Sequence, residues 1–277
     1  MDAKLQRRIQ RYGWDLAARD YEALWLNPLA PAQARLLQCA ALRPDEHVLD
    51  VASGTGLVAF AAAEHVGHGG RVLGVDLSGE MVAQARSHAD AAVHANVAFE
   101  RMDAEALALP DASFDAVLCA LGLMYVPEPV QALREMCRVL KPGGRAVLAV
   151  WGPRDRCGWA DAFSIVDAEV RGDVCPLFFR LGLSQALARL CTEAGFTAVE
   201  EHRIATRLHY ADGATACDAM FVGGPVALAW ARFDAAARKR VRAAYLRSVA
   251  PWRTSAGYAI PAEFVVVAAH APEIAPP

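Results

Sequence analysis

Three aspartates with the spacing of a nucleoside-binding site lie at the ends of apolar stretches of the chain. Asp50 opens the glycine-rich segment Asp-Val-Ala-Ser-Gly-Thr-Gly, in which glycine lets the backbone turn tightly and approach a ligand. Asp76 lies 20 residues beyond Gly56 (76 − 56), the distance typical of an acid that accepts hydrogen bonds from a ribose diol. Asp103, with the backbone of Ala104, is suited to accept the amino group of an adenine. The pattern predicts an adenosine-binding crevice.

The charge of Asp50 narrows the choice of ligand. A carboxylate at this turn would repel a pyrophosphate, but it suits a cationic ligand with an amino group. Residues 50–56 resemble motif I, D-x-x-x-G-x-G, of class I S-adenosylmethionine (SAM) methyltransferases. The resemblance implies SAM as the cofactor, with Asp50 helping to hold its methionine end. The turn residues that it implies as cofactor contacts are Ala52, Ser53, Gly54, Thr55 and Gly56.

Alternating strand and helix patterns must position these residues. Near-continuous apolar strands separated by amphipathic helices predict a parallel α/β sheet. Ligands of such sheets bind outside the carboxyl ends of the strands, which brings the three aspartates together. Asp115 begins its strand at the opposite end, so we expect it to be structural. The expected strands are residues 48–51, 71–75, 97–101, 116–121, 145–151, 197–208 and 262–270, and the main helices are 57–65, 80–94, 129–140 and 184–194.

A second resemblance covers about residues 45–151. Residues 103–115 resemble the D-A-x-x-L-P-F-x-D-x-S-F-D pattern of ubiquinone/menaquinone-biosynthesis-like methyltransferases (the methyltransferase type 11 family), and residues 138–144 match its R-x-L-K-P-G-G. This family implies a Rossmann-like seven-stranded sheet with an antiparallel last strand, here with a helical N-terminal lead and helical cap inserts. Ala52-Ser53 replaces the commoner Gly/Cys pair, and Met124-Tyr125 replaces a pair that often contains histidine.

The remaining cofactor contacts are expected from the same resemblance. Leu77, Met81 and Leu121, with Ala120 beside it, are expected to enclose the adenine. The stretch from Arg11 to Tyr21 resembles the lead helix of the family, in which a tyrosine folds over the cofactor. We expect Tyr21 in that role, with Tyr12 as the second candidate, because an aromatic face attracts a sulfonium.

The chain divides into a core and two inserts. A further helix is expected to begin at Pro31. Both inserts flank the sixth strand and are expected to cover the same end of the sheet. Their aromatic residues, among them Phe178, Phe179, Phe221, Trp230 and Trp252, would line an acceptor pocket or form the core of the cap. The expected segments are a helical lead (1–43), a SAM-binding core (44–151), a cap insert (152–183), a core continuation (184–210), a second cap insert (211–256) and a last strand with the tail (257–277).

These features predict a methyltransferase that acts by in-line displacement on a small hydrophobic or aromatic acceptor. The protein needs no nucleophile, since alignment of the reacting atoms supplies most of the rate. A general base is needed only where the acceptor must lose a proton. The candidates are His209, at the end of the sixth strand, and Tyr125, after the fourth. No metal ligand set is expected.

Composition limits the partners. The 277 residues carry a net charge of −3, which disfavours nucleic acid, and the basic run Lys4, Arg7, Arg8 and Arg11 is interpreted as a solvated helix face. Seven cysteines without a C-x-x-C favour reduced thiols in a cytoplasmic protein. We expect no signal peptide and no membrane span. A small-molecule methyl acceptor is the expected partner, and a homodimer is left open.

Two other functions fit parts of the pattern. A SAM-binding protein without turnover would keep the same cofactor residues. An NAD(P)-dependent oxidoreductase fits G-x-G-x-x-A at residues 54–59 and the acid at Asp76, but it gives Asp50 and Asp103 no role. Methyl transfer to any acceptor would distinguish a methyltransferase from a SAM-binding protein without turnover.

Overall fold

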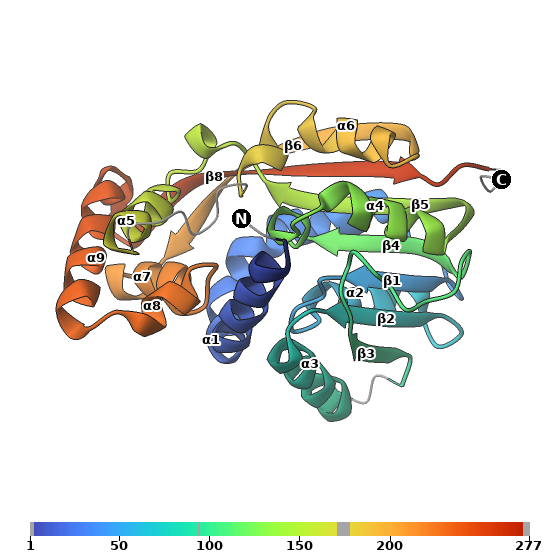
Figure 1. The fold of residues 1–277 in the computed structure, drawn as a ribbon, viewed down its shortest axis with the longest axis horizontal. Coiled ribbons are helices and arrows are strands. Elements are labelled where there is room, and N and C mark those ends of the chain that lie inside the picture. The colour runs from blue at the N-terminus through green and yellow to red at the C-terminus, as the bar shows by residue number, and fades with distance from the viewer. Residues whose placement is uncertain (1–2, 93–94, 171–177, 274–277) are drawn as a thin grey trace.

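The protein, described by a computed structural model over residues 3–92, 95–170 and 178–273, is built around one mixed sheet (Figure 1). Its strand order is β3-β2-β1-β4-β5-β8-β6, with the first five parallel and β8 antiparallel to both β5 and β6. The expected seven-stranded Rossmann-like sheet is confirmed, with a short extra strand, β7, paired to β8. The strands are β1 His47–Val51, β2 Arg71–Asp76, β3 Val97–Arg101, β4 Phe114–Ala120, β5 Leu140–Trp151, β6 Thr197–Tyr210, β7 Arg253–Thr254 and β8 Gly257–His270.

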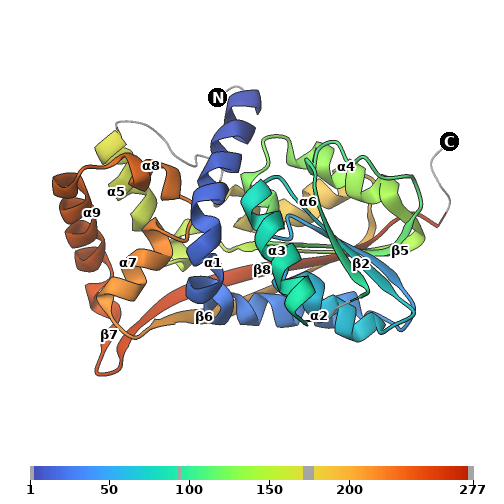
Figure 2. The ribbon, with the colours of Figure 1, turned by 90° about the horizontal axis from the view of Figure 1, so that it is seen from below.

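Helices cover both faces of the sheet. In Figure 2, α4 and α6 lie on one face, and α2 with the second arm of α1 lies on the other. The apolar strands are therefore buried on both sides, as a parallel sheet requires. The core helices are α2 Leu57–Val66, α3 Gly79–Ala92, α4 Pro129–Val139 and α6 Ala186–Glu193, and short 3-10 turns are η1 Leu123–Tyr125, η2 Arg154–Arg156, η3 Arg180–Gly182 and η4 Ala250–Trp252.

The lead segment is one long helix, α1 Ala3–Ala40, so the expectation of a separate helix starting at Pro31 is wrong. Pro28 and Pro31 lie inside the helix. Proline lacks an N–H and crowds the preceding turn, so it bends a helix that packing holds together. Figure 2 shows the two arms of α1 running in different directions. Trp25, whose indole N–H donates to the carbonyl of Gly223 (3.0 Å), fixes the helix on the C-terminal helices.

Several expected boundaries move. The Lys141–Gly144 stretch, expected to end a helix, already belongs to β5, and β6 and β8 extend beyond the predicted strands. The predicted end of the helix 80–94 reaches residues 93–94, and the predicted tail includes residues 274–277. Both lie outside the described residues, as does Cys175. The six described cysteines form no disulfide.

Four helices from the two inserts gather beside the long ends of β6 and β8 (Figure 1). We call α5 Asp161–Val170, α7 Gly213–Phe221, α8 Ala227–Arg232 and α9 Ala235–Ser248 the cap. Its interior is aromatic: Phe221 stacks on Trp230 at 5.1 Å, and Tyr245 meets Phe221 edge-on at 5.3 Å. Met220, Phe221 and Trp230 are therefore part of the packed core of the cap, and none of them lines the cavity at the carboxyl ends of the strands.

Candidate functional site

A cavity opens at the carboxyl ends of β1, β2 and β4, beneath the first half of α1. Its walls are mostly apolar, and a few polar groups converge on it. This composition is typical of a small-molecule or cofactor site. Predicted residues that line it are Tyr21, Ala52, Gly54, Asp76, Leu77, Met81, Asp103, Ala104, Ala120, Leu121 and Tyr125. Asp50, Ser53, Thr55 and Gly56 do not line it.

The glycine-rich turn forms the floor of the cavity. Ala52 and Gly54 have left-handed backbone angles, with φ of 57° and 55°. A Cβ on Gly54 would have Tyr21 as its only neighbour within 4 Å, at 3.8 Å, so a side chain there would enter the cavity. Gly56 serves packing instead, because a Cβ there would lie 2.7 Å from the rings of Phe60 and Phe99.

The carboxylate of Asp76 is held in a fixed orientation at the end of β2. The backbone N–H of Gly54 donates to Oδ2 (2.9 Å), and that of Ser78 donates to Oδ1 (2.8 Å). Each oxygen keeps a second lone pair, which suits a vicinal diol. Burial raises the pKa of Asp76, and the two backbone hydrogen bonds oppose this.

Asp50 is a buried carboxylate, 1% exposed, and neither oxygen has a hydrogen-bond partner among the described residues. Burial, followed by the neighbouring charge of Asp76, raises its pKa well above the ordinary value, and a weaker contact with the backbone N–H of Ala59 opposes this. The hydroxyls of Ser53 and Thr55 are also buried and unpartnered in the described part of the chain. Buried polar groups are normally satisfied, so this cluster under the turn fits a cationic ligand group bound directly or through water.

Asp103 lies in the loop after β3 and contacts α1. Its Oδ1 accepts from the N–H of Glu105 (3.0 Å), and its Oδ2 pairs with Nε of Arg7 (3.2 Å). Arg7 also forms an ion pair with Glu105, whose side chain is 4% exposed. Hydrogen bonding to Glu105 is the main cause that raises the pKa of Arg7. The expectation that the whole basic run is solvated is therefore wrong for Arg7.

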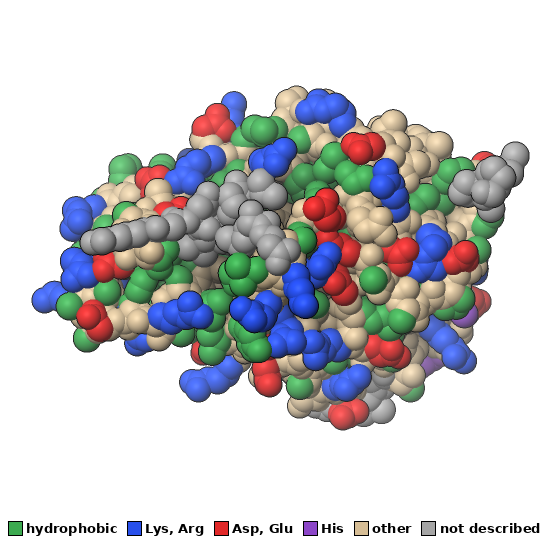
Figure 3. All heavy atoms as spheres, in the orientation of Figure 1, with side chains coloured by type: hydrophobic (Ala, Val, Ile, Leu, Met, Phe, Trp, Pro, Cys, Tyr) green, Lys and Arg blue, Asp and Glu red, His purple; other side chains and the backbone are tan. Residues whose placement is uncertain are grey.

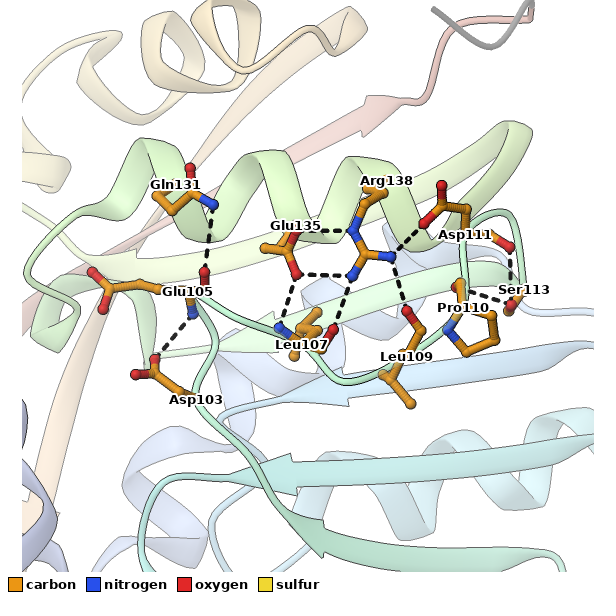
Figure 4. A network of polar contacts seen from close by, with 10 residues as sticks. All are labelled: Asp103, Glu105, Leu107, Leu109, Pro110, Asp111, Ser113, Gln131, Glu135 and Arg138. Carbon is orange, nitrogen blue, oxygen red and sulfur yellow. Dashed lines mark hydrogen bonds and ion pairs between the residues drawn. The ribbon is translucent and has the colours of Figure 1, made fainter.

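Arg138 connects the two family motifs, residues 103–115 and residues 138–144. Figure 4 shows its guanidinium between α4 and the loop that carries Asp103. It donates to the carbonyls of Leu107 (2.9 Å) and Leu109 (2.8 Å) and pairs with Glu135 (2.8 Å). Glu135 in turn accepts from the N–H of Leu107 (2.8 Å). The network fixes the loop, and with it the presentation of Asp103 and Ala104 to the cavity.

Three aromatic rings form one wall. Trp14 meets Tyr21 at 5.8 Å and Tyr125 at 5.1 Å, both edge-on. Burial is the main cause that raises the pKa of the Tyr21 hydroxyl, with the charges of Asp76 and Asp50 adding to it. Tyr12, the second candidate for this role, is 47% exposed and packs against Arg11 instead. Tyr12 is nine residues from Tyr21, half a turn out of phase on a helix.

Helical spacing could have revealed the α1 residues that the sequence analysis missed. Arg7, Gln10, Trp14 and Tyr21 all line the cavity, and they recur three, four and seven residues apart. That spacing places them on one face of a helix. The remaining missed lining residues are Val51, Val75, Met102, Gly122, Val126 and Pro127.

The two candidate bases have different surroundings. Tyr125, in η1, lines the cavity, and its ring lies 5.3 Å from that of Phe178. His209 is exposed on β6 between the buried Leu208 and Tyr210, and it does not line the cavity. Successive strand side chains point to opposite faces, so burying its neighbours turns His209 outward. The catalytic role expected of His209 stays a prediction, without a contact to this cavity.

Asp115 has the structural role expected of it. It accepts from the N–H of His47 (2.9 Å) and from Nζ of Lys141 (2.7 Å), tying together the starts of β1 and β5. Burial acts to raise its pKa, but these hydrogen bonds outweigh it and hold the pKa below the ordinary 3.8.

Residues 48–144 match a family described as a methyltransferase domain. Together with the sheet topology and the strand-end cavity, this match defines residues 48–144 as a class I SAM-dependent methyltransferase domain. A solved structure from Bacillus halodurans, described as a candidate methyltransferase, has the same fold with a TM-score of 0.62 and 25% identity. The match covers 87% of this chain and 98% of that one.

Two curated relatives narrow the resemblance within the class. The ubiquinone/menaquinone biosynthesis C-methyltransferase UbiE of Cellvibrio japonicus is 38% identical over 113 residues, covering 40% of this chain and 45% of that protein. A demethylmenaquinone methyltransferase of Shouchella clausii is 44% identical over 99 residues, covering 36% and 42%. The chain thus spans less than half the length of the curated relatives it matches.

Proposed function

We propose that this chain transfers a methyl group from SAM to a small apolar or aromatic acceptor. The observation that carries the proposal is the pairing of an oriented Asp76 carboxylate with the buried, unpartnered Asp50 beside one apolar cavity. A ribose diol and a cationic amino group would satisfy these two acids. A pyrophosphate-bearing dinucleotide would instead bring negative charge toward Asp50, which disfavours the oxidoreductase.

The proposed cofactor contacts follow the cavity walls. Asp76 would accept the ribose hydroxyls, and Asp103 with Ala104 would face the adenine amino group. Leu77, Met81 and Leu121, beside Ala120, would enclose the adenine. Residues Ala52 to Gly56 and Asp50 would hold the methionine end, with Ser53 and Thr55 acting from beneath the turn. Tyr21 would cover the cofactor from α1.

SAM would supply an electrophilic methyl group, whose carbon bonds to the acceptor while sulfur keeps the electron pair of the broken bond. The chain's part is to align the acceptor and keep water out. The rings of Trp14, Tyr21 and Tyr125 would attract the positive sulfur by about 0.5–2 kcal/mol each, depending on desolvation. Among the described lining residues, Tyr125 is the candidate to accept a proton. Tyr21 stays protonated because burial raises its pKa.

The acceptor is a further proposal. The relatives' names refer to carbon methylation of quinone precursors, and an apolar cavity bordered by aromatic rings suits a quinone-like or other natural-product ring. Carbon, oxygen and nitrogen acceptors all fit the same alignment. We further propose a cytoplasmic location, no nucleic-acid partner, and a monomer or homodimer. Across the described residues, no helix combines the length and the apolar character needed to cross a bilayer.

The first experiment is isothermal titration with SAM, S-adenosylhomocysteine and NADH, on the natural protein and on Asp76→Ala. We expect micromolar binding of both adenosyl ligands, no binding of NADH, and at least a roughly hundredfold loss in the variant, because several charge-assisted hydrogen bonds disappear. Binding of NADH alone would overturn the proposed cofactor.

The second experiment is transfer of a labelled methyl group to a panel of quinol, phenol and amine acceptors, with Tyr125→Phe as the test of a base. Transfer lowered about 10²–10⁴-fold in the variant for phenols, but not for amines, would support Tyr125 as the base. Tight SAM binding without transfer to any acceptor in a broad panel would favour the SAM-binding protein without turnover.

A further inference from the structure

The outward face of the first arm of α1 is apolar where a free surface is usually polar. Four of the six exposed large hydrophobic residues described, Leu5, Tyr12, Leu16 and Leu26, lie on this helix. Leu5, Tyr12 and Leu16 are 39%, 47% and 50% exposed, and their spacing of seven and four residues places them in one line along the helix. A line of exposed apolar side chains along one helix is a candidate interaction surface. We call this line the α1 stripe.

Cations flank the α1 stripe. Lys4, Arg8 and Arg19 are exposed, and Arg11 packs against the ring of Tyr12 at 4.4 Å. Figure 3 shows Lys and Arg side chains beside hydrophobic ones over this part of the helix. The surface thus combines apolar and positively charged groups, the composition of a helix that lies in a membrane interface.

The acids of this arm are engaged elsewhere. Asp15 accepts from the hydroxyl of Ser78 (2.6 Å) at the start of α3, and Oε2 of Glu22 lies 3.3 Å from Nδ1 of His88. Asp20 lies 3.9 Å from Arg19, at the far end of the α1 stripe. Between Lys4 and Arg11 the sequence has no acid at all. The charge on the outward face is therefore positive, which disfavours a partner whose surface is purely apolar and carries no negative charge.

Leu5 is the member of the α1 stripe that reaches the neighbourhood of the cavity. A shallow groove lined by Lys4, Leu5, Arg8, Arg11 and Arg101 shares Arg7 and Leu77 with the cavity wall. Tyr12 and Leu16 line neither, because they lie on the face of α1 roughly opposite to the cavity.

We propose that the α1 stripe docks the protein on an anionic lipid bilayer, with α1 lying in the interface. Leu5, Tyr12 and Leu16 would enter the headgroup region while the cations face lipid phosphates. Each apolar side chain contributes by leaving water, and each cation is attracted by the negative surface potential. The inference rests on the surface of α1 alone, so it holds whatever acceptor the cavity takes.

The test is co-sedimentation of the full chain with vesicles of phosphatidylcholine alone or with about 30 mol% phosphatidylglycerol, at low and at roughly 0.5 M salt. One variant removes the apolar stripe (Leu5→Ser, Tyr12→Ser, Leu16→Ser), and another removes charge (Lys4→Gln, Arg8→Gln, Arg11→Gln). A matched control, Arg189→Gln, Lys239→Gln, Arg247→Gln, makes the same charge change at exposed sites away from α1. Circular dichroism and SAM titration check that all variants are folded.

We expect salt-sensitive binding to the anionic vesicles only, reduced roughly tenfold or more by either stripe variant and unchanged in the control. No binding to anionic vesicles, or equal binding by all variants, would overturn the proposal. Analytical ultracentrifugation tests the alternative occupant of the α1 stripe, a second copy of the chain. A dimer of the natural chain that becomes monomeric in the apolar variant, without vesicle binding, would assign the stripe to a second copy and also overturn it.

Discussion

Carboxylates at the carboxyl ends of the parallel strands and at their amino ends have opposite environments. At the carboxyl ends, Asp50 has no hydrogen-bond partner in the described chain, Asp76 is held only by backbone N–H groups, and the pKa of each is raised by burial. At the amino ends, Asp115 has a lysine and a backbone N–H, and its pKa is lowered. Asp50 and Asp76 are kept available for a ligand, whereas Asp115 holds strands together.

Backbone strain, unlike the carboxylate environments, occurs at both ends of the strands. Ala52 and Leu121, both at the cavity, have left-handed φ angles of 57° and 62°, which cost an L-residue about 1–2 kcal/mol each. Asp45 and Ala112, just before β1 and β4 at the opposite end, have φ angles of 68° and 50°. The feature that sets the cavity end apart is therefore the buried, unpartnered carboxylate of Asp50.

Filling the floor of the cavity should have the largest effect. Gly54→Val would place a branched side chain in the space above the turn, at a φ of 55° that valine strongly disfavours. We expect SAM affinity to fall at least roughly a hundredfold in a titration experiment, about 2.7 kcal/mol. Gly195→Val is the matched control, because Gly195 also has a positive φ (103°) but has no atom near its Cβ position. Equal losses in both variants would show that strain, and not the cavity, is responsible.

Removing the acid at the opposite end should change stability without changing binding. In Asp115→Ala the N–H of His47 and the ammonium of Lys141 lose their partner, which should lower the free energy of unfolding by about 1–2 kcal/mol. The measurement is urea denaturation, with SAM titration on the same samples. A clear loss of SAM affinity at unchanged stability would break the comparison.

The pH dependence of stability tests the same residue. Because the folded pKa of Asp115 lies below 3.8, its stabilisation is present above that value and is lost as the pH falls through the folded pKa. The natural protein should therefore lose more stability than Asp115→Ala on acidification from about pH 5 to below pH 3.8. Parallel acid curves for the two proteins would contradict this assignment.

Neutralising Asp50 should affect binding and stability in opposite directions. The folded pKa of Asp50 lies above 3.8, so the unbound protein loses stability as the pH rises from 3.8 through the folded pKa, and Asp50→Asn removes this loss. The same ionisation favours a cationic ligand, so SAM binding should tighten with rising pH in the natural protein only. We expect about tenfold weaker binding by Asp50→Asn near pH 8, from titrations between about pH 5 and pH 8. The same pH slope in both proteins would assign it to another group.

Relieving the strained turn should have the smallest effect. Ala52→Gly removes the penalty of a left-handed alanine but makes the unfolded chain more flexible, so a net gain of at most about 1 kcal/mol is expected. SAM affinity should change less than about threefold, because the turn keeps its path. Thermal denaturation measures the first and titration the second. A marked loss of stability would mean that the Cβ of Ala52, packed against Gly122, matters more than the strain.

Local patterns determined the cofactor half of the molecule. The strand and helix periods, the glycine turn and the acids at strand ends depend on neighbours within a few residues, and parallel strands must bring their carboxyl ends to one edge. The placement of Asp76, Asp103, Leu77 and Met81 at one cavity, and of Asp115 away from it, could therefore be predicted from the sequence.

Only the tertiary structure decided the partners of long-range contacts. Arg7 and Asp103 are 96 residues apart (103 − 7), and no local pattern says that α1 lies over the loop after β3. Whether His209 faced the cavity depended on which face of β6 was covered. The aromatic residues of the inserts could have lined a pocket or formed a core, and only their packing distinguished the two. Sequence periodicity shows which residues share a face, whereas the partner of that face depends on how the whole chain folds back on itself.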